Sequence, residues 1–162
     1  MWYKAWRCGC RMRQTLFPDV RFHHVRSREP VFLLAFWLFV LWWDANGWLL
    51  LSLIVSVLHE LGHICVYYLL TGECPDISIG FSGICMYTQH KWLPRGKEFW
   101  ITAAGPFTNG VLAYIGWLLL QQKATFLRLG WVWANVLIGL FNLLPIPPLD
   151  GWHMLHLLLK KQ

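Results

Sequence analysis

The stretch LHELGHICVYYLL, residues 58 to 70, decides how this chain is interpreted. It places two histidines and a glutamate inside a run that otherwise has the composition of a membrane-spanning helix. Ionisable side chains are costly at that depth and usually have a function there. On a helix, His59 and His63 point within about 40° of one another and can share a metal ion. Glu60 is turned away by about 100° and would lie beside that ion as a base for water.

The composition around this stretch is that of a membrane protein. The chain has 162 residues, is 57% hydrophobic and contains 12 tryptophans, which is too apolar for an ordinary soluble domain. Its formal charge of +6 does not indicate nucleic-acid binding, because the basic residues gather in an amino-terminal arm, one loop and the tail. We expect a basic cytoplasmic arm over residues 1–29 and a single membrane-embedded domain over residues 30–162.

Four apolar segments predict an all-α membrane protein with about four transmembrane helices. The second and third are long enough to cross a hydrocarbon core, which needs about 20 helical residues. The first is short, and a proline break interrupts the last, so we expect a Pro-broken final helix. The segments are residues 31–43, 48–70, 99–120 and 129–144.

The distribution of charge predicts the orientation of these helices. With four spans, all the Lys and Arg residues except Lys123 and Arg128 lie on one side. Both termini should therefore be cytoplasmic. The loop over residues 76–89 lies on the same side and alternates around Gly80 and Gly83, as a small β-hairpin would. This ribbon is either a plain surface feature or a neighbour of the site.

A catalytic zinc ion needs a third protein ligand, and Asp150 is the candidate. The three prolines of FNLLPIPPLDG, residues 141–151, deny that segment its helical hydrogen bonds. An open backbone at membrane depth must be buried in protein or line a wet cavity, where a carboxylate can face a metal. The alternative is that Asp150 caps the helix that follows. The remaining acids are expected in arms, turns or loops: Asp19, Glu29, Asp44, Glu73, Asp76 and Glu98.

Two amides in apolar segments are candidates for binding substrate. Asn109 lies in TAAGPFTNG, residues 102–110, whose small residues allow close helix packing. It either joins helices or lines the substrate path. Asn142 poses the same choice nearer the site, where an amide can hold a peptide carbonyl or stabilise an oxyanion.

Two further groups of metal-binding side chains leave alternatives open. His153 and His156 follow Asp150 and either supply a replacement ligand or face the cytoplasmic interface. The other group lies in the amino-terminal arm and consists of Cys8, Cys10, His23 and His24. These residues either form a second metal site or belong to a reduced, solvated arm.

With these stretches in hand, the chain resembles the site-2 protease family, peptidase family M50, and within it the compact, sporulation-protease-like branch. Residues 59–63 fit the family's HExxH, residues 105–109 fit its GPxxN, and residues 142–151 fit NxxPxPxLDG. Three motifs in the expected order are far more specific than any one of them. The resemblance covers residues 31–159.

The resemblance implies an intramembrane zinc metalloprotease that cuts peptide bonds in or near transmembrane segments of membrane-tethered proteins. It implies one Zn²⁺ per chain held by His59, His63 and Asp150, with Glu60 activating the water. Asn142 would orient substrate, and the hairpin would offer an edge to an extended peptide. The expected location is the plasma membrane of a bacterium. The expected partners are lipid, a membrane-anchored substrate and a regulatory membrane protein, with no nucleic acid.

Two rival functions remain at this point. The first is a proteolytically inactive zinc-binding membrane protein that binds client helices, although metal binding alone does not require Glu60. The second is an ion transporter, for which four spans without an internal repeat offer little support.

Overall fold

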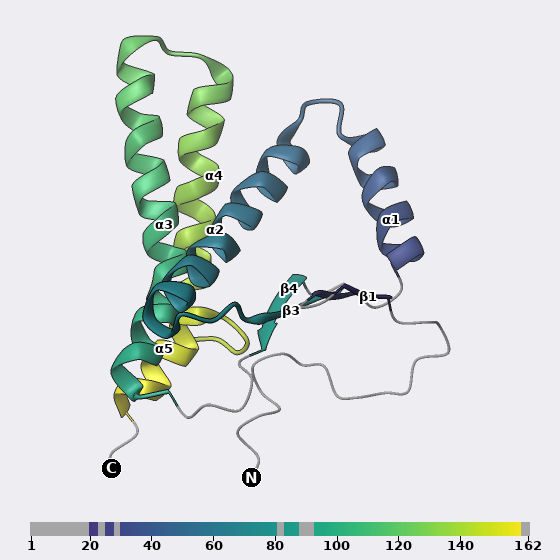
Figure 1. Cartoon of the computed structure of the whole chain (residues 1–162). Helices are drawn as coiled ribbons and strands as arrows, with labels where there is room; N and C mark the ends of the chain where they lie inside the picture. Colours follow the sequence, from purple (N-terminus) through teal and green to yellow (C-terminus); the bar gives the residue numbers. More distant parts are fainter. Residues whose placement is uncertain (1–19, 23–24, 28–29, 81–82, 88–92, 160–162) are drawn as a thin grey trace.

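The computed structural model describes residues 20–22, 25–27, 30–80, 83–87 and 93–159. Within these ranges the chain is mostly helical, with a small sheet beside the helices (Figure 1). In chain order the elements are β1 (Val20–Phe22), β2 (Val25–Ser27), α1 (Pro30–Trp43), α2 (Trp48–Thr71), β3 (Asp76–Gly80), β4 (Gly83–Tyr87), α3 (Arg95–Gln122), α4 (Phe126–Asn142) and α5 (Asp150–Leu159).

The helices follow the apolar segments of the sequence. α2 and α3, of 24 and 28 residues, are long and apolar enough to cross a membrane by length and composition. α4 is a shorter apolar helix of 17 residues, and α1 has 14. These features are those of a membrane protein, while the number of spans stays a prediction. α3 begins at Arg95, four residues before the expected segment, so Glu98 lies in its first turn rather than in a loop.

The ends of α2 are fixed by short-range contacts that its sequence supplies. Asp44 precedes the helix, and its carboxylate accepts hydrogen bonds from the backbone N–H groups of Trp48, Leu49 and Leu50 at 2.8–3.1 Å. These donors have no partner within the helix, and the negative charge suits its amino-terminal end. At the other end Gly72 adopts a left-handed conformation, with φ of 73°, and its N–H donates to the carbonyl of Tyr68.

The sheet is larger than the hairpin expected from the sequence. β3 and β4 pair antiparallel, with Asp76 opposite Tyr87 and Gly80 opposite Gly83. β2 pairs parallel to β3, and β1 pairs antiparallel to β2, which gives the order β1-β2-β3-β4. The expected hairpin is therefore present as β3 and β4 in a mostly helical chain, and the structure adds two strands that the sequence did not predict, both from the basic arm. Each has three residues, too few for an alternating pattern to be recognised.

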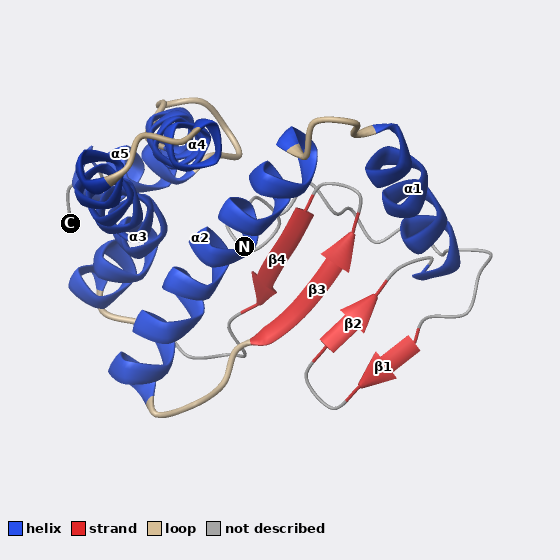
Figure 2. Ribbon diagram, turned by 90° about the horizontal axis from the view of Figure 1, so that it is seen from above, coloured by secondary structure: helices blue, strands red, loops and turns tan. Residues whose placement is uncertain are grey.

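The helices form a bundle in which α2 holds the central position. α3 and α4 stand side by side and antiparallel, and α5 lies at the base of this pair (Figure 1). The sheet lies at the same end as α5, whereas the α1–α2 and α3–α4 turns lie at the opposite end. Seen along the bundle, α2 separates the strands from α3, α4 and α5, and α1 stands apart from that group (Figure 2).

The interior of the bundle is built on one stripe of α2. Its buried residues recur every four positions, which places them on one face of the helix. Leu51 and Val55 pack against Ala134 of α4. The surface is apolar: Phe107 is 73% exposed and Trp133 54%. Large apolar side chains facing outward are the arrangement expected of helices in contact with lipid. The buried stripe is Leu51, Val55, His59, His63 and Tyr67.

Candidate metal centre

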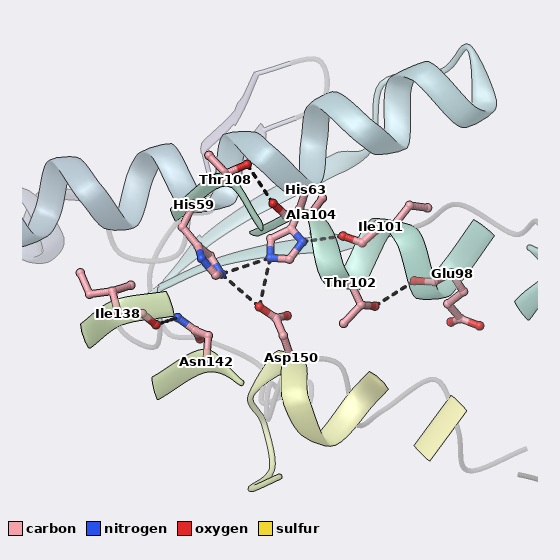
Figure 3. Close-up of polar contacts among 10 residues, drawn as sticks. All are labelled: His59, His63, Glu98, Ile101, Thr102, Ala104, Thr108, Ile138, Asn142 and Asp150. Atoms are coloured by element: carbon pink, nitrogen blue, oxygen red, sulfur yellow. Dashed lines mark hydrogen bonds and ion pairs between the residues drawn. The ribbon is translucent and has the colours of Figure 1, made fainter. Parts of the chain in front are cut away.

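Three side chains from α2 and α5 converge at the middle of the buried stripe (Figure 3). His59 Nε2 lies 3.2 Å from His63 Nε2 and 3.0 Å from Asp150 Oδ2. Asp150 Oδ2 is also 3.2 Å from His63 Nε2. The two histidines are buried, and the aspartate side chain is only 21% exposed. Residues 91 positions apart in sequence therefore bring three potential ligand atoms to one point.

The spacing of these atoms fits a single zinc ion. Zinc binds histidine nitrogen and carboxylate oxygen at about 2.0–2.2 Å in a tetrahedral arrangement, which separates neighbouring ligand atoms by about 3.3 Å. The three observed separations are 3.0, 3.2 and 3.2 Å. Two nitrogens and one oxygen are also a donor set found in catalytic zinc sites, where a fourth position stays open. Without a cation, burying this carboxylate would be costly.

The backbone of α3 forms a wall against the Nε2 edge of the two imidazoles, the edge that also contacts Asp150. A Cβ atom at Gly105 would collide with the Nε2 atoms of both His59 and His63. A Cβ atom at Gly62 would likewise run into Thr108 and the carbonyl of Ala104. Glycine at these two positions lets α2 and α3 approach closely at the level of the cluster. The small residues expected to pack helices therefore also make room for the histidine rings.

A main-chain carbonyl fixes the orientation of His63. Its Nδ1 lies 2.7 Å from the carbonyl oxygen of Ile101, which can only accept a hydrogen bond (Figure 3). Nδ1 must therefore carry the proton, which leaves Nε2 free to face the cluster. His59 differs, because its buried Nδ1 has no hydrogen-bond partner among the described residues.

Asp150 follows directly after the non-helical segment between α4 and α5, which brings its side chain to the histidines. α4 ends at Asn142 and α5 begins at Asp150, and residues 143–149 contain all three prolines. A Cβ atom at Gly151 would collide with the backbone of Leu143 and Leu144, so α5 starts in direct contact with the broken segment. The Oδ2 atom of Asp150 contacts the histidines of α2, which is not the contact that a simple helix cap would make.

The other predicted site residues lie at different distances from the cluster. Glu60 is partly buried and follows His59 on the adjacent side of α2. Asn142 is partly buried at the last position of α4, and its side-chain N–H donates to the carbonyl of Ile138 at 2.9 Å. Asn109 is fully buried, and its Cβ lies against Gly139 of α4. This placement favours the helix-packing alternative for Asn109, and its role toward substrate stays a prediction.

The remaining candidate ligands lie outside the cluster. His153 Nε2 is 3.5 Å from a carboxylate oxygen of Glu98, and His156 is exposed and stacked on Trp152. Neither belongs to the group formed by residues 59, 63 and 150. The proposed second group, Cys8, Cys10, His23 and His24, falls outside the described residues.

Sequence reasoning missed three contributions to this site. The carbonyl of Ile101 belongs to the main chain, so no side-chain pattern could indicate it. The sequence indicates Gly105 as a small residue for helix packing, and only the structure places it against the Nε2 atoms of both imidazoles. The sequence places Glu98 in a loop, whereas its side chain is only 14% exposed and faces α5. The available signal was its position directly before the apolar segment 99–120, because acids are frequent in the first turn of a helix.

Comparisons with known proteins show what this chain is similar to. Residues 121–162, which carry the proline break and Asp150, match peptidase family M50. The stage IV sporulation protein FB of Bacillus subtilis (strain 168) is 32% identical over 119 residues, covering 70% of this chain and 41% of that protein. The chain thus spans less than half of that relative's length. The site-2 protease from Methanocaldococcus jannaschii shares the fold, with a TM-score of 0.64 and 21% identity over 88% of this chain and 72% of that chain.

The family resemblance drawn from the three motifs is confirmed. The chain belongs to peptidase family M50.

Proposed function

We propose that this protein is an intramembrane zinc metalloprotease that hydrolyses peptide bonds in or near transmembrane segments of membrane-tethered proteins. One observation carries the proposal: the Nε2 atoms of His59 and His63 and the Oδ2 atom of Asp150 form a triangle with sides of 3.0–3.2 Å. That triangle matches the ligand spacing of one tetrahedral zinc ion, and it lies on an apolar helix long enough to span a bilayer.

In this proposal the protein's own residues divide the chemistry between them. His59, His63 and Asp150 hold the metal. Bound zinc acts as a Lewis acid and lowers the pKa of water to about 7. Glu60 accepts the proton that water loses when its oxygen attacks the scissile carbonyl carbon. It then gives that proton to the leaving amine as the carbon–nitrogen bond breaks.

Two regions beside the cluster are proposed to hold the substrate. The side chain of Asn142 lies at the end of α4, where the chain turns toward Asp150. An amide there can hold a peptide carbonyl near the reacting bond. A helical substrate must be unwound before its peptide bonds are accessible, and adding a strand to the sheet would keep it extended. β2 already occupies one side of β3, so we place this role on the outer edge of β4.

We propose four spans with both termini in the cytoplasm of a bacterium. Support comes from the charge distribution, because all the basic residues except Lys123 and Arg128 fall on the side assigned to the termini. The arrangement of elements is compatible with this, since α5 and the sheet lie at one end and the α3–α4 turn at the other. Cleavage near His63 would then release a fragment toward the cytoplasm. A regulatory membrane protein is a further partner in this proposal.

The decisive experiment tests whether cleavage depends on Glu60. The full-length chain is reconstituted in lipid vesicles with a panel of tagged single-span proteins, and the products are separated by size. We expect the wild type to cut at least one client within or near its span. Glu60→Gln should abolish cleavage and retain zinc, because Glu60 is not a ligand in this proposal.

Glu73→Gln is the matched control, because Glu73 is an exposed acid just beyond the end of α2 and should not affect cleavage. Zinc binding without any Glu60-dependent cleavage would reject the protease. It would support the alternative of an inactive zinc protein that binds client helices.

A further inference from the structure

We propose that Glu98 and His153 form a positioning pair that aims Asp150 at the metal, an inference that rests on the zinc centre proposed above. His153 Nε2 lies 3.5 Å from Glu98 Oε1, a separation within ion-pair range but without a hydrogen bond. The contact joins the first turn of α3 to the first turn of α5. The side chains of Glu98 and His153 are 14% and 23% exposed, so protein covers most of both.

The turn of α3 that carries Glu98 also contacts the histidine helix. The carbonyl of Ile101 accepts the hydrogen bond from His63 Nδ1. The hydroxyl of Thr102 donates to the main-chain carbonyl of Glu98 at 2.9 Å, within the same turn (Figure 3). One turn of α3 therefore touches both the helix that carries His63 and, through Glu98, the helix that carries Asp150. It sets the distance between ligands that come from different elements.

His153 is well placed to control the direction of the Asp150 carboxylate. Three positions along a helix of 3.6 residues per turn leave two side chains within about 60° of one another. α5 has only ten residues and follows the non-helical segment 143–149, so its rotation depends on tertiary contacts. Joining His153 to α3 restricts that rotation. Gly151, packed on the backbone of the broken segment, fixes where α5 begins but not how it is rotated.

Zinc affinity tests the pair without any assay of cleavage. The full-length chain is purified in detergent, and its zinc dissociation constant is measured by competition with a chelator on the folded, monodisperse fraction. Contacts that orient metal ligands typically contribute 10–100-fold to affinity. We expect Glu98→Gln and His153→Gln each to weaken zinc binding about tenfold or more. The double variant should bind no more weakly than the weaker single variant, because the two residues form one contact.

Two further variants separate positioning from a general loss of structure. In an Asp150→Asn background, adding Glu98→Gln should leave the residual zinc affinity unchanged, because the ligand that it positions is already lost. Exchanging the partners, with Glu98→His and His153→Glu in one chain, should recover part of the lost affinity. A purely structural defect would show neither behaviour.

The controls are His156→Gln, an exposed histidine on the same helix, and Glu73→Gln. Both should bind zinc as the wild type does. Equal affinity in the wild type and in both pair variants would overturn this inference and leave the metal centre intact. A wild type that binds no zinc would overturn the metal centre and this inference with it.

Discussion

Two groups of polar side chains are buried in this apolar bundle, and they differ in how their polar atoms are satisfied. In the first, the side chains of His59, His63 and Asp150 contact one another and a carbonyl of α3 holds His63, so that among the polar atoms of these three side chains His59 Nδ1 alone is a buried atom without a partner in the described residues. In the second, Asn109 of α3 and Asn135 of α4 are both 0% exposed. Neither polar atom of the Asn109 side chain, nor Asn135 Oδ1, has a hydrogen-bond partner among the described residues.

The difference shows that burial of a polar group does not by itself identify a reactive site. Both groups occur in helices whose surroundings disfavour polar atoms. Only the first brings groups from separate elements to a common point with the spacing of metal ligands. The second is confined to packing surfaces, where Gly139 lies against Asn109. The candidate metal centre is distinguished by the convergence of ligand atoms from separate elements, and not by how deeply these atoms are buried.

The largest expected effect follows from removing a ligand. Asp150→Asn replaces a carboxylate by a neutral amide of similar shape, so it should weaken zinc binding about 100-fold or more, the upper end of the effects seen for residues that only orient ligands. Chelator competition measures the change. The control is Asp44→Asn, which makes the same chemical change at the amino-terminal end of α2, away from the histidines. It should leave zinc affinity unchanged. If Asp150→Asn binds zinc as tightly as the wild type, Asp150 is not a ligand.

A smaller effect is expected where a methyl group is added against the Nε2 atoms of the histidines. Gly105→Ala should destabilise the protein by about 1–3 kcal/mol, because the new group collides with both imidazoles, and it should weaken zinc binding. Gly110→Ala, on the same helix with open space around it, should be neutral or slightly stabilising. Unfolding in SDS and chelator competition measure the two properties. Wild-type zinc affinity in Gly105→Ala would show that α3 does not form this wall.

The smallest effect is expected in the second polar group. Asn109→Leu replaces an amide without partners by an apolar side chain of the same shape, so the free energy of unfolding should change by less than about 1 kcal/mol. Zinc affinity should not change. A large loss of stability would mean that the amide has a partner, such as an ordered water molecule. Loss of cleavage with zinc and stability intact would instead support a role for Asn109 toward substrate.

The sequence predicted most of the helical framework and the residues that meet at the site. The apolar run around His59 became α2 with almost the same bounds, since periodicity and length both reflect the local backbone. The prolines before Asp150 lie in a non-helical segment, because proline has no backbone N–H to donate and its ring clashes with the preceding turn of a helix. That these distant residues converge is a fact of the structure, whereas their roles as ligands and base stay predictions.

The features that the sequence did not reveal depend on contacts between elements. Strands β1 and β2 are too short for a pattern. β2 exists through pairing with β3, which lies about 50 residues further along the chain, and β1 through pairing with β2. The contact of Glu98 with His153 joins the first turns of α3 and α5. It could not be predicted without knowing how α5 packs against α3. Gly105 looks like any small residue in an apolar helix until the imidazoles are placed beside it. A local sequence pattern does not indicate contacts with residues that are far away in the chain.

The hydrogen bond from His63 to the carbonyl of Ile101 has a consequence for how this site tolerates mutation. Every residue type has that carbonyl, so no single substitution at position 101 deletes the acceptor. A substitution of the buried Ile101 side chain therefore changes packing but keeps the acceptor that fixes the imidazole tautomer. With His63 in place, the contact is lost only when α3 moves relative to α2. The imidazole tautomer of His63 therefore depends on how these two helices pack, and not on the side chain at position 101.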